Sequence, residues 1–233
     1  MAPSVRKIRV AMIDSGIHAA HPHVQGVAGG VGFDANGIEQ ADYVDRLGHG
    51  TAVAAAIREL APAAELLAIK VFDRTLTASV RSLVAGIEWA VVGGAALVNL
   101  SLGTSNAEHA AALGAAAERA SARGTVIVAA GEHDGVRWLP GTLEQVIRVE
   151  LDWGCPRGTF TCATADGGPV FRTCGYPRPI PGVEPARNLK GLSFAVANMT
   201  GMTARLTGEL DLVGYDALVG ALRQQAGVSR VDS

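Results

Sequence analysis

Short apolar runs and amphipathic stretches alternate along most of this chain of 233 residues. Five runs rich in valine, isoleucine and leucine are typical of buried strands: KIRVAMID (7–14), ELLAIKVF (65–72), ALVNLSLG (96–103), TVIVAAG (125–131) and QVIRVEL (145–151). Five stretches are alanine-rich or have apolar positions at helical spacing: 49–60, 79–94, 107–124, 191–208 and 216–226. Strands that alternate with helices predict an α/β fold, with a mostly parallel sheet and helices on both faces.

The pattern breaks between residues 152 and 190, where glycine, proline, cysteine and threonine replace the apolar periodicity. We expect this insert to form irregular hairpins and loops packed on the sheet. The periodic pattern resumes after it, so the whole chain, 1–233, is predicted to be one domain.

Composition narrows the class of protein. Hydrophobic residues make up 48% of the chain and charged residues 18%, with a formal net charge of −2. No basic excess favours nucleic acid or an anionic membrane as a partner, so we expect neither. The apolar runs are too short to span a bilayer, and the N-terminus lacks the apolar core of a secretory signal. The expected location is the cytoplasm, while the oligomeric state is left open.

Three cysteines, Cys155, Cys162 and Cys174, lie in the irregular insert. An odd number in a chain without a secretory signal predicts reduced thiols with a structural role. A Cys155–Cys162 disulfide is the minor alternative. The spacing matches no zinc site, because no close CxxC pair or histidine accompanies these residues.

Residues that can do chemistry lie at the expected strand ends and helix starts. Asp14 ends a buried run, while His49 and Ser193 begin helical stretches. In open parallel sheets, ligands bind beyond the carboxyl ends of the strands, so these side chains are expected at one edge. A serine hydroxyl, an imidazole and a buried carboxylate are the nucleophile, the base and the orienting acid of a catalytic triad. The order Asp, His, Ser is one of three chain orders in which this triad occurs on unrelated folds.

The residues around these three side chains resemble the subtilase family of serine proteases. VAMIDSGIHAAHP (10–22) is similar to the aspartate motif, GHGTAVAAAI (48–57) to the histidine motif, and GLSFAVANMTG (191–201) to a drifted serine motif, usually GTSMAxPHVxG. The resemblance extends over about residues 10–201. It implies a subtilisin-like three-layer fold and a serine endopeptidase.

The resemblance assigns roles to individual residues. Ser193 attacks the scissile carbonyl, His49 carries the proton, and Asp14 orients the imidazole. The SLG and AAG segments line the first specificity pocket and hold a peptide as an added β-strand. Their residues are Ser101, Leu102, Gly103, Ala129, Ala130 and Gly131.

The bottom of that pocket departs from the family pattern. Aligning WLPG with the family's YPG places Trp138 or Leu139 near the floor. A bulky floor predicts that only Gly, Ala or Ser fits before the cut. The alternative is that Trp138 is an ordinary core residue.

The oxyanion hole departs as well. After AAG the family has an asparagine whose amide donates to the oxyanion, beside the backbone N–H of the nucleophile, here Ser193. This chain has Glu132 at that position. A carboxylate donates nothing, and losing such a donor costs about 100- to 1000-fold in turnover. Three accounts remain open. Glu132 is protonated and donates a hydrogen bond to the oxyanion; or Glu132 turns away and His133 or a backbone amide donates in its place; or the site is catalytically inactive or very slow, and the fold binds peptides.

Other departures concern the serine motif and metal binding. Leu192 stands where threonine is usual, and Ala197 and Asn198 replace the family's Pro-His pair. The glycine- and asparagine-rich loop with which the family often binds calcium is missing after residue 60, so no calcium, metal or other cofactor is expected. His18, His21 and His23 resemble a metal cluster, but the family uses this stretch as a surface loop.

Two functions compete. The first is a compact cytoplasmic endopeptidase that processes a dedicated substrate, for example by removing the leader from a biosynthetic precursor peptide. The second is a pseudoprotease that binds peptides in an intact groove beside an impaired oxyanion hole. Asp14 lies so close to the N-terminus that either the sequence is a mature form or the enzyme folds without a propeptide; the initial methionine favours the latter.

Overall fold

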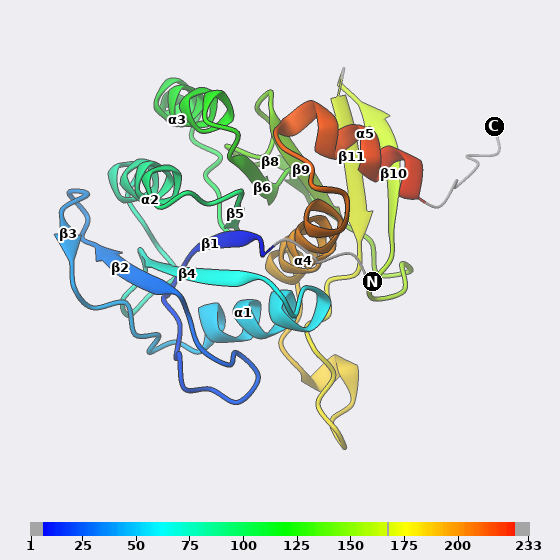
Figure 1. The fold of residues 1–233 in the computed structure, drawn as a ribbon, viewed down its shortest axis with the longest axis horizontal. Coiled ribbons are helices and arrows are strands. Elements are labelled where there is room, and N and C mark those ends of the chain that lie inside the picture. The colour runs from blue at the N-terminus through cyan, green and yellow to red at the C-terminus, as the bar shows by residue number, and fades with distance from the viewer. Residues whose placement is uncertain (1–6, 167, 227–233) are drawn as a thin grey trace.

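The frame of the protein is a nine-stranded sheet, here described from a computed structural model that covers residues 7–166 and 168–226 (Figure 1). The strand order across the sheet is β10-β11-β9-β6-β5-β1-β4-β2-β3. The bounds of these strands are β1 Arg9–Asp14, β2 Gly29–Phe33, β3 Glu39–Gln40, β4 Glu65–Lys70, β5 Leu97–Leu100, β6 Val126–Ala130, β9 Val146–Leu151, β10 Phe160–Ala165 and β11 Gly168–Thr173. A separate hairpin pairs β7 (Glu132–His133) with β8 (Val136–Arg137).

Helices cover both faces of the sheet, so the fold has three layers (Figure 1). The α-helices are α1 His49–Leu60, α2 Val80–Val92, α3 Ala110–Ala122, α4 Leu192–Leu210 and α5 Tyr215–Gln225. Short 3-10 turns lie at Ala107–His109 and Pro185–Arg187. Six pairs of neighbouring strands are parallel, whereas β2–β3 and β10–β11 are antiparallel. The predicted α/β architecture is confirmed.

Strand β1 shows why the central runs are apolar at every position. Val10 and Met12 pack into the core on the side of α1 and α4, whereas Ala11 and Ile13 pack into the core beneath α2 and α3. Because both faces of a parallel sheet are covered, a central strand reads as a continuous apolar run and not as an alternating one.

The insert differs from its prediction. Part of it does not pack on the sheet but forms its edge, since β11 pairs in parallel with β9 and in antiparallel with β10. Only Val170 and Phe171 in β11 are deeply buried apolar residues, and this sparse signal did not predict a strand. From Gly175 to Gly191 the chain projects away from the sheet, below α1 and α4 in Figure 1. We call residues 175–191 the projecting segment.

The cysteines are all free thiols, so the alternative Cys155–Cys162 disulfide is wrong. Cys155 and Cys174 are buried, which agrees with a structural role. Burial raises the pKa of the Cys162 thiol, although Arg223 acts in the opposite direction. In the part of the chain that the structure describes, no helix is long and apolar enough to cross a membrane.

Candidate active site

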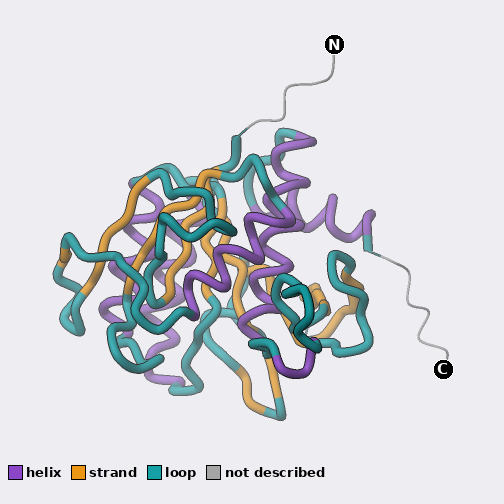
Figure 2. The backbone as a smooth tube through the Cα atoms, turned by 90° about the horizontal axis from the view of Figure 1, so that it is seen from below, coloured by secondary structure: helices purple, strands orange, loops and turns teal. Residues whose placement is uncertain are grey.

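The predicted site residues meet at the carboxyl edge of the sheet. Asp14 is the last residue of β1, and Ser101 directly follows β5. Helix α1 begins at His49 and α4 begins one residue before Ser193. Seen from below, α1 crosses in front of the strands and loops surround it (Figure 2). Four segments far apart in the sequence therefore contribute to one edge.

Asp14 and His49 are in direct contact. The Asp14 carboxylate oxygen Oδ1 lies 2.7 Å from Nδ1 of His49 and also accepts the backbone N–H of Ser15 at 2.7 Å. Gly50 makes this approach possible, since a Cβ there would lie 2.1 Å from the carbonyl oxygen of Gly16. The glycine after the histidine lets α1 start against the end of β1.

The electrostatics of this pair favour a charged imidazole. Burial by itself lowers the pKa of His49, but the hydrogen bond to Asp14 and the charges of Asp14 and Asp45 outweigh it. The net effect raises the pKa of His49 above its ordinary value of 6.5. An arrangement that stabilises imidazolium is what a general base needs after it has taken a proton.

Ser193 is anchored to the segment after β5. Its hydroxyl donates to the carbonyl oxygen of Ser101 at 3.2 Å. The Ser101 hydroxyl in turn reaches the Ser193 carbonyl at 3.5 Å and accepts from the buried amide of Asn99 at 2.8 Å. The neighbouring ring of Phe194 contacts the His49 imidazole, with centroids 5.8 Å apart. The contacts thus join Asp14 to His49, and Ser193 to Ser101.

The sequence analysis missed Asp45, which fixes the chain around His49. One carboxylate oxygen, Oδ1, accepts from the Ser15 hydroxyl and the backbone N–H groups of Leu47 and Gly48, at 2.8, 2.9 and 2.9 Å. The other, Oδ2, accepts from the backbone and hydroxyl of Thr51 at 2.9 and 2.6 Å. Asp45 lies four positions before His49 and three before Gly48, and an acidic residue spaced in this way from a glycine is the sequence signal of such a turn.

Burial alone raises the pKa of Asp45. The hydrogen bonds from Thr51, Ser15 and Leu47 together outweigh the effect of burial, so the pKa of Asp45 lies below its ordinary value. Asp45 is therefore a buried anion held by donors from both sides of His49.

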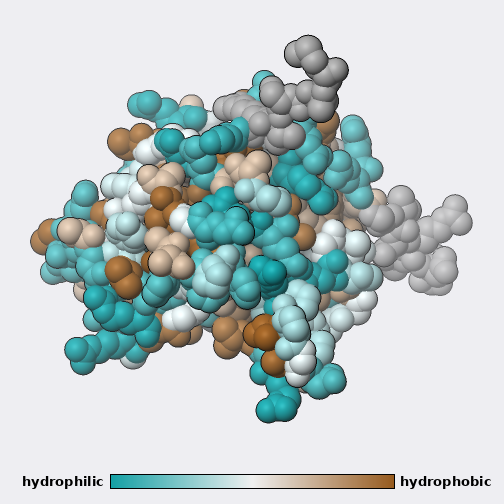
Figure 3. Space-filling view, turned by 60° about the horizontal axis from the view of Figure 1, so that its bottom comes forward, coloured by the Kyte–Doolittle hydropathy of each residue, from teal (hydrophilic) through white to brown (hydrophobic). Residues whose placement is uncertain are grey.

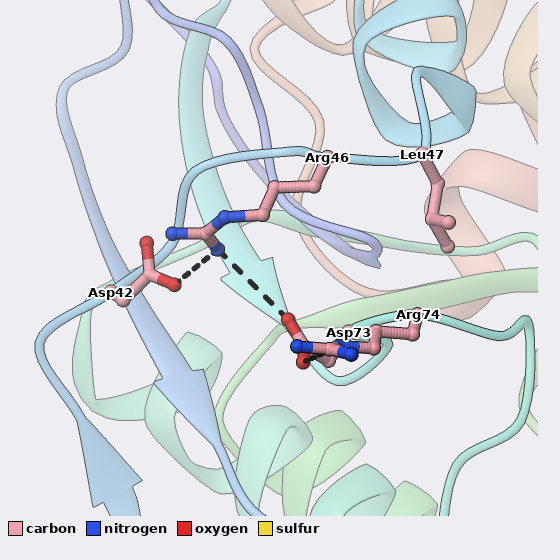
Figure 4. A pocket seen from close by; sticks show the side chains of 5 residues that line it. All are labelled: Asp42, Arg46, Leu47, Asp73 and Arg74. Carbon is pink, nitrogen blue, oxygen red and sulfur yellow. Dashed lines mark hydrogen bonds and ion pairs between the residues drawn. The ribbon is translucent and has the colours of Figure 1, made fainter.

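A cluster of charges lies beside this turn (Figure 4). Arg46 reaches between Asp42 and Asp73, and the buried amine of Lys70 at the end of β4 binds the same two carboxylates, at 3.0 and 3.1 Å. The side chains of Asp42, Arg46 and Asp73 border a cavity of about 550 Å³ together with Leu47 and Arg74. Hydrogen bonds from Arg46, Lys70 and the Val44 backbone hold the pKa of Asp42 far below its usual range. The cluster ties the chain before His49 to the end of β4.

Glu132 forms ion pairs at the end of β6. Its carboxylate lies 3.4 Å from the guanidinium of Arg148, which also binds Glu150 at 2.7 Å. The stem of Arg148 packs against Gly131, where a Cβ would lie 2.3 Å from the arginine Cγ. The neighbouring His133 is half-buried and pairs with Asp134 at 3.4 Å.

Trp138 connects the two segments predicted to line the first pocket. Its backbone N–H donates to the carbonyl of Gly131 at 2.7 Å, and its Cβ faces Gly103. The next residue, Leu139, exchanges two backbone hydrogen bonds with Thr104, at 3.0 and 2.9 Å. Trp138 also packs against the core on the side of α1 and α4. It therefore combines core packing with a place between the two segments.

Comparison with known sequences identifies the family. The sequence pattern of the subtilase family matches residues 6–149, more than half of the chain. The chain belongs to the subtilase family.

Individual subtilases extend the similarity beyond that range. Subtilisin DY of Bacillus licheniformis is 35% identical over 219 residues, which cover 84% of this chain and 75% of that protein. The thermostable alkaline protease of Halalkalibacterium halodurans is 38% identical over 136 residues, which cover 54% of this chain and 36% of that protein. The match to subtilisin E of Bacillus subtilis, 36% identical, likewise covers only 35% of that relative.

Solved structures support the same fold. A cold adapted subtilisin-like serine proteinase has a TM-score of 0.71 at 18% identity, covering 96% of this chain and 85% of that one. A mutant of the protease domain of PatA has a TM-score of 0.64 at 24% identity, covering 90% and 83%. The expected subtilisin-like fold is confirmed.

Asn198, which replaces the histidine of the subtilase serine motif, is completely buried in α4. Its amide donates to the carbonyls of Cys174 and Tyr176 at 2.8 and 2.9 Å. The backbone N–H of Gly191 also donates to Gly175 at 2.9 Å. These bonds fix the base of the projecting segment next to Ser193. Leu192, at the position of the family's threonine, is half-buried against the core.

The three histidines after β1 lie close together. The rings of His21 and His23 are stacked edge to face, 5.1 Å apart, and Nδ1 of His21 accepts the backbone N–H of His23 at 3.3 Å. Among the described residues, no group of three or more His, Cys, Asp or Glu side chains could hold a metal ion. The calcium expectation stays a prediction.

Proposed function

We propose that this subtilase is a serine endopeptidase in which Asp14, His49 and Ser193 form the catalytic triad. The observation that carries the proposal is the 2.7 Å contact between Asp14 and Nδ1 of His49, which leaves the other imidazole nitrogen, Nε2, as the one that accepts the proton of the nucleophile. Membership of the subtilase family supports the same activity.

The reaction starts when the Ser193 hydroxyl turns from the Ser101 carbonyl to His49, which takes its proton. The serine oxygen then bonds to the scissile carbonyl carbon. His49 gives the proton to the departing amine as the C–N bond breaks, and an ester remains on Ser193. A water molecule, deprotonated by His49, attacks this ester, and His49 returns the proton to the Ser193 oxygen as the second product, the carboxylic acid, leaves. Asp14 stabilises the imidazolium in both halves of the reaction.

Of the three accounts of Glu132, the ion pair with Arg148 favours the one in which its carboxylate turns away from the oxyanion. A carboxylate held by a guanidinium has no proton to donate. The Ser193 backbone N–H, in the first turn of α4, is then the main donor of the oxyanion hole. We expect a working enzyme with a low turnover number.

The bound peptide lies along residues 101–103 and 129–131 as an added strand. Trp138 lies between these segments, which supports a first pocket that takes only Gly, Ala or Ser. A cavity of about 190 Å³ beside Leu102, with both apolar walls (Phe72, Leu83) and polar ones (Thr77, Thr104), would take one further side chain of the peptide. Such a groove selects few sequences, which suits cytoplasmic processing of a dedicated precursor peptide.

The second candidate is a peptide-binding pseudoprotease. Two observations favour it: Glu132 replaces the oxyanion donor, and the Ser193 hydroxyl donates to Ser101. In this candidate the groove holds a peptide but does not cleave it.

A randomised octapeptide library, analysed by mass spectrometry, separates the two. The endopeptidase predicts internal cleavage after Gly, Ala or Ser that disappears in Ser193→Ala. Efficient cleavage after Phe or Leu would refute the small first pocket. Capture of intact peptides by the wild type, with no cleavage, would identify a pseudoprotease.

A further inference from the structure

The structure has an apolar cleft next to His49 that none of the steps above uses. It has a volume of about 480 Å³ and lies between the histidine-rich loop after β1, the first turns of α1 and the projecting segment. Gly48 and Thr51, on either side of His49, belong to its lining. The cleft therefore adjoins the catalytic residues.

The walls of the cleft are apolar. Ala52 and Ala55 form the wall on α1, and their short side chains leave the space open. Opposite them lie Pro177, Ile180 and Leu189 of the projecting segment. Ile180 and Leu189 are 46% and 52% exposed, and in Figure 3 the segment protruding at the lower edge carries hydrophobic residues among polar ones. Apolar side chains exposed around a concavity favour contact with an apolar ligand group.

The rim of the cleft is basic. Arg178 borders it with His18, His21 and His23, whereas the charge of Arg46, also in the lining, is already paired with Asp42. The single carboxylate in the lining, Asp45, is buried, and both of its oxygens already accept hydrogen bonds. A ligand therefore meets apolar walls inside the cleft and positive charge at its opening. In a peptide, this charge disfavours a Lys or Arg next to the apolar residue that enters the cleft.

The position of the cleft identifies its occupant. In Figure 1, β5 and β6, which lead into residues 101–103 and 129–131, lie on one side of α4, while α1 and the projecting segment lie on the other. A peptide that runs along the first two segments and crosses Ser193 continues toward the cleft. The base of the projecting segment is fixed beside Ser193 by Asn198, so the wall is held in place.

We propose that this cleft binds an apolar side chain, such as Leu, Ile or Phe, within the first three residues after the cleaved bond of the substrate. The proposal rests on the proposed endopeptidase function and extends it to the leaving part of the peptide. Specificity would then depend on both sides of the cut, with a small residue before it and an apolar residue after it.

Ile180→Asp tests this inference because it places a charge in the cleft at an exposed position, where the effect on folding is small. Ile38→Asp is the matched control, since Ile38 is 59% exposed in the turn between β2 and β3. Wild type and both variants cleave the randomised octapeptide library, and the residues after each cut are counted. We expect enrichment of Leu, Ile and Phe in wild type and Ile38→Asp, and a loss of about tenfold in Ile180→Asp.

The two proposals fail in different ways. Labelling of Ser193 by a fluorophosphonate probe should be the same in all three proteins. Two results would overturn the cleft as a subsite, given equal labelling of the three proteins. Either the wild type shows no enrichment of Leu, Ile and Phe after the cut, or Ile180→Asp shows the same enrichment as the wild type. If wild type neither labels nor cleaves, the endopeptidase fails. The cleft is then tested with Ser193→Ala, which should capture library peptides rich in Leu, Ile and Phe; capture without that bias would overturn it.

Discussion

The substitution Asp45→Asn tests whether one buried carboxylate positions His49. In the protein this carboxylate accepts five hydrogen bonds, three on Oδ1 and two on Oδ2. An asparagine side chain has the same shape but only one oxygen, and its NH₂ group donates. At least two buried donors therefore lose their acceptor and face another donor.

The expected loss of stability follows from these two bonds. A hydrogen bond to a charged group contributes about 1.5–3 kcal/mol, and the Thr51 hydroxyl can rotate to another partner, so we take the lower end. The free energy of unfolding should fall by about 3 kcal/mol. Because Leu47 and Gly48 precede His49, the imidazole also loses its fixed position, and a displacement of about 1 Å costs about 100-fold in rate.

Urea unfolding between pH 3 and 8 measures the first effect and peptide cleavage the second. The folded pKa of Asp45 lies below its ordinary value of 3.8, so its stabilisation is fully present above that value and is lost as the pH falls through the folded pKa. The difference between wild type and Asp45→Asn should therefore be constant above about pH 5 and shrink at more acid pH.

Asp34→Asn is the control, because Asp34 also accepts two backbone N–H groups, at 2.9 Å each, but in the exposed turn between β2 and β3. It should cost less than about 1 kcal/mol and leave cleavage unchanged. Equal effects of the two substitutions, or an Asp45→Asn variant with full activity, would refute the positioning role.

Three further predictions concern the oxyanion hole and its surroundings. Glu132→Asn restores an amide donor and should raise turnover at least about tenfold in steady-state cleavage; an unchanged rate would mean that an amide at position 132 does not reach the oxyanion. Gly131→Ala collides with the stem of Arg148 and should cost about 1–3 kcal/mol in urea unfolding, whereas Gly114→Ala, in open space on α3, should stabilise slightly. Asn198→Ala leaves two carbonyls unpaired and should cost about 2–4 kcal/mol; wild-type stability would contradict the anchoring role.

In the part of the chain that the structure describes, the apolar pattern predicted the central strands, because both faces of the sheet are buried, and the five α-helices, because each is alanine-rich or has apolar positions at helical spacing. The short strands β2, β3, β7 and β8 were not predicted, because they carry few apolar residues. They form only through pairing: β2 with β4 and β3, and β7 with β8. Hairpins were predicted in the insert, but the place of β10–β11 at the edge of the sheet was not, because it is set by parallel pairing with β9, which leaves no periodic signal in the sequence.

The sequence motifs predicted the positions of the three proposed triad residues. Asp14 lies at the end of a strand, and His49 and Ser193 lie at the starts of helices, as the sequence pattern predicted. The partner of Glu132 was not predictable, because Arg148 belongs to a neighbouring strand and reaches Glu132 only through the register of β6 and β9. The same is true of Lys70, which binds Asp42 from a distant segment, and of the bond from Ser15 to Asp45, although the other partners of Asp45 are local.

The most direct test of the central claim is the rate at which a fluorophosphonate probe labels Ser193 between pH 4 and 9. The account predicts labelling that rises with pH as His49 loses its proton, with a midpoint above 6.5, because the pKa of His49 is raised. Ser193→Ala should abolish labelling, and Asp14→Asn should slow it and lower the midpoint. No labelling of the wild type, together with rapid labelling of Glu132→Asn, would contradict the account and identify a peptide-binding protein instead.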